Sequence, residues 1–237
     1  MKKNMHIARI ALPLAVLMLG ACATSSPTIN TQAAPEDMSY DGLYPVDGTR
    51  VTQAWARADL DLRSYNKILL QGAGIQYRPV KSAGYRGMAG RSGKNEFPLD
   101  EQQKERVAAA ATEAFRGELG KIKSLEIVTE PGPDVLIVRG ALLDVVSRVP
   151  PDPVGRSNTY LDSVGEATLV IELADSQSGS VLVRAVDRRA AQQTGWMTES
   201  TSVTNAAEVR RLFSSWARLV RTALEELTDD LDIGETR

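Results

Sequence analysis

The amino-acid sequence predicts a single α/β domain of the α+β kind, in which two main helices pack on one mixed or mainly antiparallel sheet. Three patterns predict it: a strand hairpin over residues 164–190, a capped helix over residues 99–122, and an amphipathic helix near the C-terminus. Strands with helices at either end are typical of this class. A length of 237 residues suits one such domain with an additional segment.

The N-terminus has the features of a cleaved targeting segment. An apolar run over residues 10–19 follows a basic stretch, and it is too short to span a bilayer, which takes about 20 apolar residues. The run ends in Leu19-Gly20-Ala21-Cys22, which resembles the lipobox of bacterial lipoproteins. The resemblance implies removal of residues 1–21 and acylation of Cys22. An ordinary secretory signal with an incidental cysteine is the weaker alternative, because the only cysteine stands at the cleavage point.

Removal of this segment changes the charge and the chemistry available. The whole chain has 28 Lys and Arg against 30 Asp and Glu, and loss of Lys2, Lys3 and Arg9 leaves 25 basic residues and a net charge of −5. The only histidine, His6, is lost as well. Catalysis by Ser-His-Asp or Cys-His, zinc sites built on His or Cys, and disulfides are therefore excluded. A mildly acidic chain is a poor nucleic-acid binder, and we expect no cofactor and no metal.

Residues 22–41 have the composition of a flexible tether. They are small, polar and punctuated by proline, so they cannot bury enough surface to offset their ordering entropy. The folded domain is then expected over residues 42–237. Ala23 stands where an aspartate is the familiar signal for inner-membrane retention in enteric bacteria. Resemblance to that sorting rule implies the outer membrane of a Gram-negative bacterium, with the domain facing the periplasm.

The first half of the domain predicts three strands and one helix. Short apolar runs over residues 68–70 and 125–128 predict strands, the first of them opening the sheet. Between them, Asp100 and Gln103 form a D-x-x-Q capping box at the start of a helix over residues 99–122. A long apolar stretch over residues 134–146 predicts a central strand, in which Gly140 is the expected position of a bulge or bend.

Residues 164–190 carry the clearest strand pattern. Apolar and polar residues alternate, so four side chains are expected to face the core: Ala167, Leu169, Ile171 and Leu173. The loop over residues 175–179 has the composition of a hairpin turn with a left-handed glycine at Gly179. If residues 175 and 181 pair, Glu172 lies opposite Arg184 on the outer face. That pair contributes about 0.2–1 kcal/mol, or nothing if both side chains are solvated.

The last helix is predicted from Asn205, in an N-x-x-E start, to about residue 231. Apolar residues at spacings of three and four form one stripe, which includes Leu212, Phe213, Trp216 and Val220. We expect this stripe to pack on the sheet, with Trp216 as a core residue. A membrane-surface role for the basic face is the weaker alternative, because acidic residues follow at 225–230.

Several short motifs occur in order along the chain: Ser39-Tyr40-Asp41-Gly42-Leu43, Pro133-Asp134-Val135-Leu136, Arg139-Gly140-Ala141, Gly165-Glu166-Ala167 with Glu172, Ala174-Asp175-Ser176 with Gly179, Val186-Asp187-Arg188, and Ser215-Trp216-Ala217. Together they resemble the bacterial lipoproteins grouped as domain of unknown function 3313, over about residues 39–230. The resemblance implies an α/β envelope lipoprotein with no assigned activity, and it supplies no catalytic residues.

Two apparent catalytic motifs are incomplete. In the glycine-rich stretch that looks like a phosphate loop, Met88 stands where the first glycine belongs and Asn95 replaces the magnesium-binding hydroxyl. Ser64 and Lys67 fit the S-x-x-K start of a penicillin-binding site, but the K-T-G element that such sites also need is missing. Neither nucleotide binding nor acyl transfer is therefore expected.

Carboxylates leave a second function class open. Glu166 and Glu172 share one strand face, and Asp187 has the parity of the apolar face of its strand. A buried aspartate can be an acid with a raised pKa, or, more commonly, a structural group paired with arginine or backbone donors. Two carboxylates about 5–10 Å apart suffice for glycoside hydrolysis. An envelope hydrolase acting on glycan is thus the alternative reading.

Residues 72–98 are glycine-rich and basic, with no Asp or Glu before Glu96. A loop of this length is usually functional or disordered. Its charge, opposite to that of the mature chain, suits an anionic partner such as peptidoglycan carboxylates, lipid phosphates or an acidic protein face. The candidate partner-binding residues are Arg78, Lys81, Arg86, Arg91 and Lys94. A disordered insertion without a binding role is the alternative.

The favoured function is therefore a non-catalytic, lipid-anchored envelope lipoprotein that acts as a binding or scaffold module. Its lipid attachment site is Cys22. Its expected partners are the membrane, through the lipid, and an envelope protein or peptidoglycan. A carboxylate pair in a concave cleft would favour the hydrolase, whereas a flat, closed core would favour the binding module.

Overall fold

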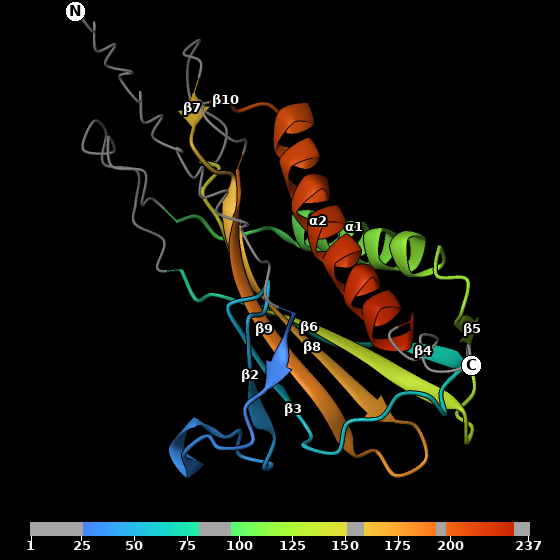
Figure 1. The fold of residues 1–237 in the computed structure, drawn as a ribbon. Coiled ribbons are helices and arrows are strands. Elements are labelled where there is room, and N and C mark those ends of the chain that lie inside the picture. Colours follow the sequence, from blue (N-terminus) through green and yellow to red (C-terminus); the bar gives the residue numbers. More distant parts are fainter. Residues whose placement is uncertain (1–25, 81–95, 151–158, 193–197, 230–237) are drawn as a thin grey trace, which may run out of the picture.

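The computed structural model describes residues 26–80, 96–150, 159–192 and 198–229. Within these ranges eight strands form one sheet, in the order β1-β2-β3-β9-β8-β6-β4-β5 (Figure 1). Their bounds are Thr28–Ile29 for β1, Tyr44–Asp47 for β2, Gln53–Ala56 for β3, Lys67–Tyr77 for β4, Glu126–Val128 for β5, Val135–Ser147 for β6, Gly165–Asp175 for β8 and Val181–Ala191 for β9. The helices are α1 (Glu101–Leu119), α2 (Ser202–Asp229) and the short 3-10 helix η1 (Pro35–Asp37).

The sheet is mixed, which confirms the predicted α+β single domain. Strand β4 runs parallel to both β5 and β6, while the other neighbouring pairs are antiparallel. A separate two-stranded ribbon joins β7 (Tyr160–Leu161) to β10 (Thr198–Glu199). The parallel β4–β6 pair places the ends of distant chain segments side by side, and this arrangement builds the sites described below.

The hairpin of β8 and β9 confirms the alternation in the sequence. All four residues expected to face the core are at most 6% exposed: Ala167, Leu169, Ile171 and Leu173. Gly179 has φ +70°, the left-handed conformation that the turn requires. Glu172 pairs with Arg184, as expected, although a register shift near the turn brings Ala174 rather than residue 175 opposite Val181.

Both helices lie on one face of the sheet, where α2 supplies most of the helical core (Figure 1). Trp216 is fully buried and Phe213 nearly so, which confirms the predicted stripe. The helix begins at Ser202, about one turn before the predicted Asn205. The reason is a cap that the N-x-x-E pattern did not reveal: the backbone amides of Thr201 and Thr204 each donate to the other residue's hydroxyl.

Helix α1 has the predicted capping box. The amide of Gln103 donates to Asp100 Oδ1 at 2.7 Å, and the amide of Asp100 donates to Gln103 Oε1 at 2.9 Å. Within α1 only Leu119 is fully buried, because the helix packs beside α2 rather than squarely on the sheet (Figure 1). This position leaves space between α1 and the strands beneath it.

The irregularity of β6 is at Asp144, not at Gly140. Gly140 pairs regularly with Gly72 on one side and with Ile171 on the other. The register against β8 shifts between Leu143 and Val146, where Asp144 has φ +55°. Aspartate tolerates this left-handed conformation better than most residues, and an inserted residue of this kind changes the direction of its side chain.

Residues 28–41, which the sequence assigns to a tether, instead pack on the sheet. β1 pairs with β2, and the indole of Trp55 donates to the carbonyl of Asp37. Ser39 accepts the amide of Leu43 in a tight turn, and Leu43 is 3% exposed. The strand predicted at residues 68–70 is consequently the fourth along the chain rather than the first. The three strands that precede it are too short to produce a recognisable alternation of apolar and polar residues.

The predicted basic loop starts later than expected, because residues 72–77 belong to β4. The strand continues through Gly72 and Gly74, with register shifts against β6 beyond Gly72 and a φ of +99° at Gly74. The glycines of this segment predict a loop, whereas in the structure they permit an irregular strand.

Candidate functional site

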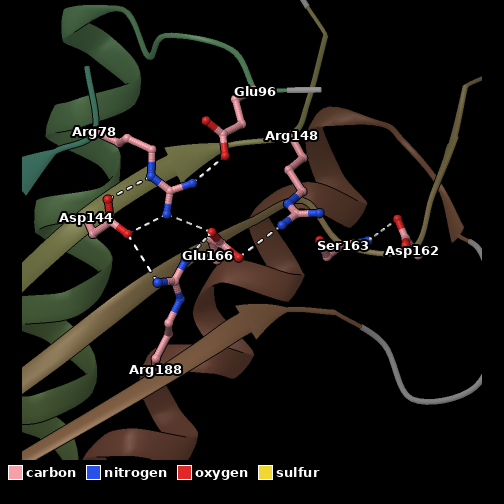
Figure 2. A network of polar contacts seen from close by, with 8 residues as sticks. All are labelled: Arg78, Glu96, Asp144, Arg148, Asp162, Ser163, Glu166 and Arg188. Atoms are coloured by element: carbon pink, nitrogen blue, oxygen red, sulfur yellow. Dashed lines mark hydrogen bonds and ion pairs between the residues drawn. The ribbon is translucent and has the colours of Figure 1, made fainter. Parts of the chain in front are cut away.

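An ion-pair network surrounds Arg78 on the sheet face opposite the helices (Figure 2). Arg78 directly follows β4, and its Nε donates to Asp144 Oδ1 at 2.7 Å. Its Nη2 donates to Glu166 Oε1 on β8 at 2.7 Å, and its Nη1 pairs with Glu96. The bulge in β6 is what turns Asp144 toward this guanidinium. Arg78 thus joins three segments of chain.

Two further arginines complete the network around Glu166. Arg188 Nη2 lies 2.6 Å from Glu166 Oε1, and Arg148 Nη2 lies 3.0 Å from Glu166 Oε2 (Figure 2). Burial raises the pKa of Glu166, but the hydrogen bonds from Arg78 and Arg188 outweigh that effect and hold the pKa below its usual value. Glu166 is therefore ionised at neutral pH and has no proton to donate as a general acid.

A second network lies further along the same face, around Arg184. Arg184 Nε donates to Glu172 Oε1 at 2.8 Å, and its Nη1 donates to Asp41 Oδ1 at 2.7 Å. Arg139 reaches the other oxygen of Glu172 at 3.2 Å, and the ring of Tyr40 lies 4.7 Å from the guanidinium carbon of Arg184. Hydrogen bonds from Arg184 lower the pKa of Asp41 to about 2.

The structure does not bring the predicted carboxylates together as a catalytic pair. Glu166 and Glu172 are six residues apart on one strand, or about 20 Å at the usual rise per residue, against the roughly 5–10 Å that glycoside hydrolysis uses. Asp144 and Glu166 are close to each other, but they share the guanidinium of Arg78 between them. Asp187 is buried and bound by Trp216 and Arg189, as the structural reading predicts.

Only Arg78 of the five candidate loop residues lies within the described part of the chain. Its side chain is 19% exposed and engaged by carboxylates of its own chain, so it is a structural residue rather than an open contact for a partner. Lys81, Arg86, Arg91 and Lys94 lie outside the described residues, as does Cys22.

A cavity of about 480 Å³ lies on the other face, between α1 and strands β4, β6 and β8. Its sheet wall is formed by aliphatic side chains: Leu70, Ile75, Val138, Leu142, Leu169 and Ile171. Its helix wall is formed by Ala108, Ala111, Thr112 and Phe115. The volume lies within the range of roughly 300–1,000 Å³ that ligand pockets occupy. In the lining drawn from the described residues, no side chain is an Asp or Glu.

Small residues on both walls make this cavity. Gly72 and Gly74 on β4 have open space where a Cβ would stand, and Gly140 on β6 faces the same space. Opposite them, α1 presents Ala108 and Ala111. Sequence reasoning missed the site. Its signal was the pairing of alternate glycines on strands with an alanine-rich helical face, which becomes informative only once the strands are known to be neighbours.

A family model described as "Protein of unknown function (DUF3313)" matches residues 32–220 of this chain. No curated protein matches the chain in sequence. Among solved structures, protein XCC0632 from Xanthomonas campestris is similar at 14% identity and a TM-score of 0.38, covering 78% of this chain and 95% of that one. The PelC dodecamer from Paraburkholderia phytofirmans is similar at 12% identity and a TM-score of 0.33, covering 70% of this chain and 96% of that one.

Rare lipoprotein B from Shewanella oneidensis is also similar, at 12% identity and a TM-score of 0.23, covering 70% of this chain and 96% of that one. Likeness at these levels is limited to the general fold. The described ranges hold no group of three or more His, Cys, Asp or Glu side chains arranged for a metal ion. In the same ranges neither α1 nor α2 has the length and apolar composition needed to cross a membrane.

Proposed function

We propose that this chain, which belongs to the DUF3313 family of proteins of unknown function, is a lipid-anchored protein of the bacterial outer membrane that binds a partner and does not catalyse a reaction. The anchor is the acylated Cys22 at the end of the lipobox. Several acyl chains on one residue hold a protein stably, whereas a single chain binds only marginally. The domain then faces the periplasm on a short spacer.

The observation that carries the proposal is the separation of the carboxylates from the cavity. Glu166 and Glu172 lie on the face of the sheet opposite the helices, each held by arginine. Asp187 is buried against Trp216 of α2, outside the lining of the cavity. The concave site lies on the helix face and has an apolar lining. A hydrolase needs its carboxylates in the cleft that holds the substrate. The arrangement therefore supports binding rather than hydrolysis. The core is not flat and closed, as the sequence analysis expects of a binding module, because it contains the cavity.

Acyl labelling and membrane fractionation test the anchor. Cys22→Ala is expected to leave an unprocessed precursor without label, while Ala23→Asp is expected to keep the label and move the protein to the inner membrane in an enteric host. Thr24→Ala, two residues past the cysteine, is the control and should behave as wild type. Continued labelling of Cys22→Ala would refute the anchor.

The remaining basic loop residues are the proposed contact with an envelope protein or peptidoglycan. Lys81, Arg86, Arg91 and Lys94 supply charge-assisted donors, and contacts between exposed charges weaken as salt rises. Their joint change to Ser should remove crosslinks formed in intact cells while leaving the folded domain unchanged. Arg78 is left in place because its removal would disturb the sheet. An unaltered crosslink pattern at low salt would show that the loop is not the contact.

A further inference from the structure

Helix α1 is attached to the rest of the domain at both ends of the cavity. Near its start, the hydroxyl of Tyr77 at the end of β4 donates to the carbonyl of Lys104 at 3.3 Å. Near its end, Glu118 pairs with Arg221 of α2 at 3.2 Å, and Leu119 is buried. The cavity lies between these two attachments. It is therefore a preformed space, which is the usual condition of a ligand pocket.

The walls of this space suit an unbranched aliphatic chain. They consist of Leu, Ile, Val, Ala and Phe side chains with glycine backbone between them. Such surfaces gain free energy when an apolar group displaces water, by about 25 cal/mol per Å². They provide few hydrogen-bonding groups inside the cavity, so a sugar or a peptide backbone entering it would lose hydrogen bonds to water without replacement.

The rim carries a cation that no described carboxylate pairs with. Arg116 of α1 lines the cavity, and its residue is exposed. In the described ranges no carboxylate pairs with its guanidinium, in contrast to the arginines of the opposite face. Thr112 is the other polar side chain in the lining, since the side chain of Gln71 accepts Arg139 Nε on the opposite face of the sheet. A guanidinium at the mouth of an apolar cavity favours a ligand with an anionic head and an apolar tail.

We propose that this cavity binds a single-chain anionic amphiphile, with the aliphatic chain between α1 and the sheet and the carboxylate or phosphate head at Arg116. A long-chain fatty acid is the simplest member of this class. The inference rests on the binding role proposed above and names its ligand. In a protein anchored at a membrane, such a molecule is available from the lipid itself.

Photoaffinity labelling tests the site directly. The full chain is mixed with neutral phosphatidylcholine vesicles and a free fatty acid that carries a diazirine near the end of its chain, then irradiated and digested. Label is expected on peptides from α1 and β4 that line the cavity, and excess palmitate or lysophosphatidylglycerol should suppress it. Of these two competitors, the one that acts at lower concentration identifies the head. Evenly spread label, or failure of both competitors, would refute the proposal.

Substitutions by phenylalanine inside and outside the cavity test where the aliphatic chain of the ligand binds. Gly72→Phe fills the cavity from the sheet, where there is open space and an ordinary φ, and Ala111→Phe fills it from the helix if the first variant folds poorly. Either should reduce labelling about tenfold, equivalent to about 1.4 kcal/mol. Gly117→Phe also enters open space, but outside the lining, and should label as wild type. Undiminished labelling of both filled variants, with unfolding curves that show a folded protein, would overturn the site.

Reversing the charge at Arg116 tests whether the anionic head of the ligand binds there. Arg116→Glu should weaken labelling by the fatty acid about tenfold and leave labelling by the matching uncharged alcohol unchanged. Arg106→Glu, on the same helix but outside the lining, is the control. Equal losses in both variants would mean a general charge effect and refute the role of Arg116. Because labelling does not require an anchored protein, its failure is distinguishable from failure of the lipid anchor at Cys22.

Discussion

Asp187 has a structural role, because donors from several elements bind its carboxylate. It is 6% exposed and accepts the indole N–H of Trp216 at 2.8 Å and the amide N–H of Thr52 at 3.1 Å. Arg189 pairs with it at 2.6 Å. These partners come from β9, α2 and the residue that precedes β3, so the carboxylate joins the sheet to the helix above it. A buried charge is tolerated here because each part of it has a donor.

Trp216 should therefore contribute in two separable ways. Trp216→Ala is expected to lower the free energy of unfolding by about 3–5 kcal/mol, through a lost buried ring. Trp216→Phe keeps most of the apolar surface but removes the donor to Asp187, for a loss of about 1.5–3 kcal/mol. Urea denaturation measures both. Trp55→Phe is the control, since its indole donates to an exposed carbonyl; a loss as large as that of Trp216→Phe would contradict this account.

Arg78 is expected to be essential for stability, unlike the other loop cations. Arg78→Ser leaves Asp144 and Glu166 partly buried with fewer partners, and breaking a buried pair costs about 3–5 kcal/mol, less where solvent screens the pair. A loss of about 2–4 kcal/mol in urea denaturation is expected. Lys81→Ser serves as the control and should change stability little. Equal stability of the two variants would mean that Arg78 is not held as described.

The hairpin of β8 and β9 has one face in the core and one face among charged side chains. Leu169 pairs with Leu142 on β6 and lies in the core, whereas its neighbour Thr168 pairs with Arg188 on the open face. Adjacent residues of one strand therefore meet opposite environments. A shift of one residue in register would exchange them.

Leu169→Asp is expected to unfold the domain, because an unpaired charge would be buried among aliphatic side chains. Thr168→Asp should be tolerated, since the new carboxylate would lie opposite Arg188. Circular dichroism and thermal unfolding of the two variants distinguish these outcomes. If both variants fold equally well, the assignment of the two faces is incorrect.

At the scale of the whole molecule, the sheet separates an apolar face covered by helices from a face of carboxylate–arginine pairs. The pairs join residues far apart in the chain: Arg184 and Asp41 are separated by 143 positions, and Arg78 and Glu166 by 88. The open face thus holds the N-terminal strands and the hairpin together through charge. Its contribution depends on the carboxylates remaining ionised.

Stability should accordingly fall only in acid. Hydrogen bonds from Arg184 lower the pKa of Asp41 to about 2, and those from Arg78 lower the pKa of Asp144, whereas unfolded aspartates titrate near pH 3.9. A lowered folded pKa gives stability that is complete above the unfolded value and is lost as pH falls toward about 2. With His6 the only histidine, urea midpoints should be nearly flat between about pH 5 and 8.

Asp41→Asn is the matched variant for this measurement. It removes one ionisable partner of Arg184, so the acid-induced decrease of its urea midpoint should be smaller than that of wild type, from a lower starting value. An identical acid profile in the two proteins would show that Asp41 does not contribute to the pH dependence.

Local patterns in the chain were sufficient for the secondary structure of the main elements. The period of two in β8 specified which side chains face the core, the D-x-x-Q box specified where α1 begins, and the apolar stripe placed Trp216 in the core. Each signal lies within a few residues of the feature that it predicts. Hydrogen bonding and burial at that range depend on the sequence spacing itself, which is why these predictions were confirmed.

The sites depend instead on which distant segments become neighbours. Arg78 reads as a loop cation until the parallel pairing of β4 with β6 places it beside Asp144, 66 positions away. The cavity exists because Gly72 and Gly140 pair across two strands and α1 stands above them. Strand order, register and the position of a helix on a sheet result from the packing of the whole domain, and no local period encodes them.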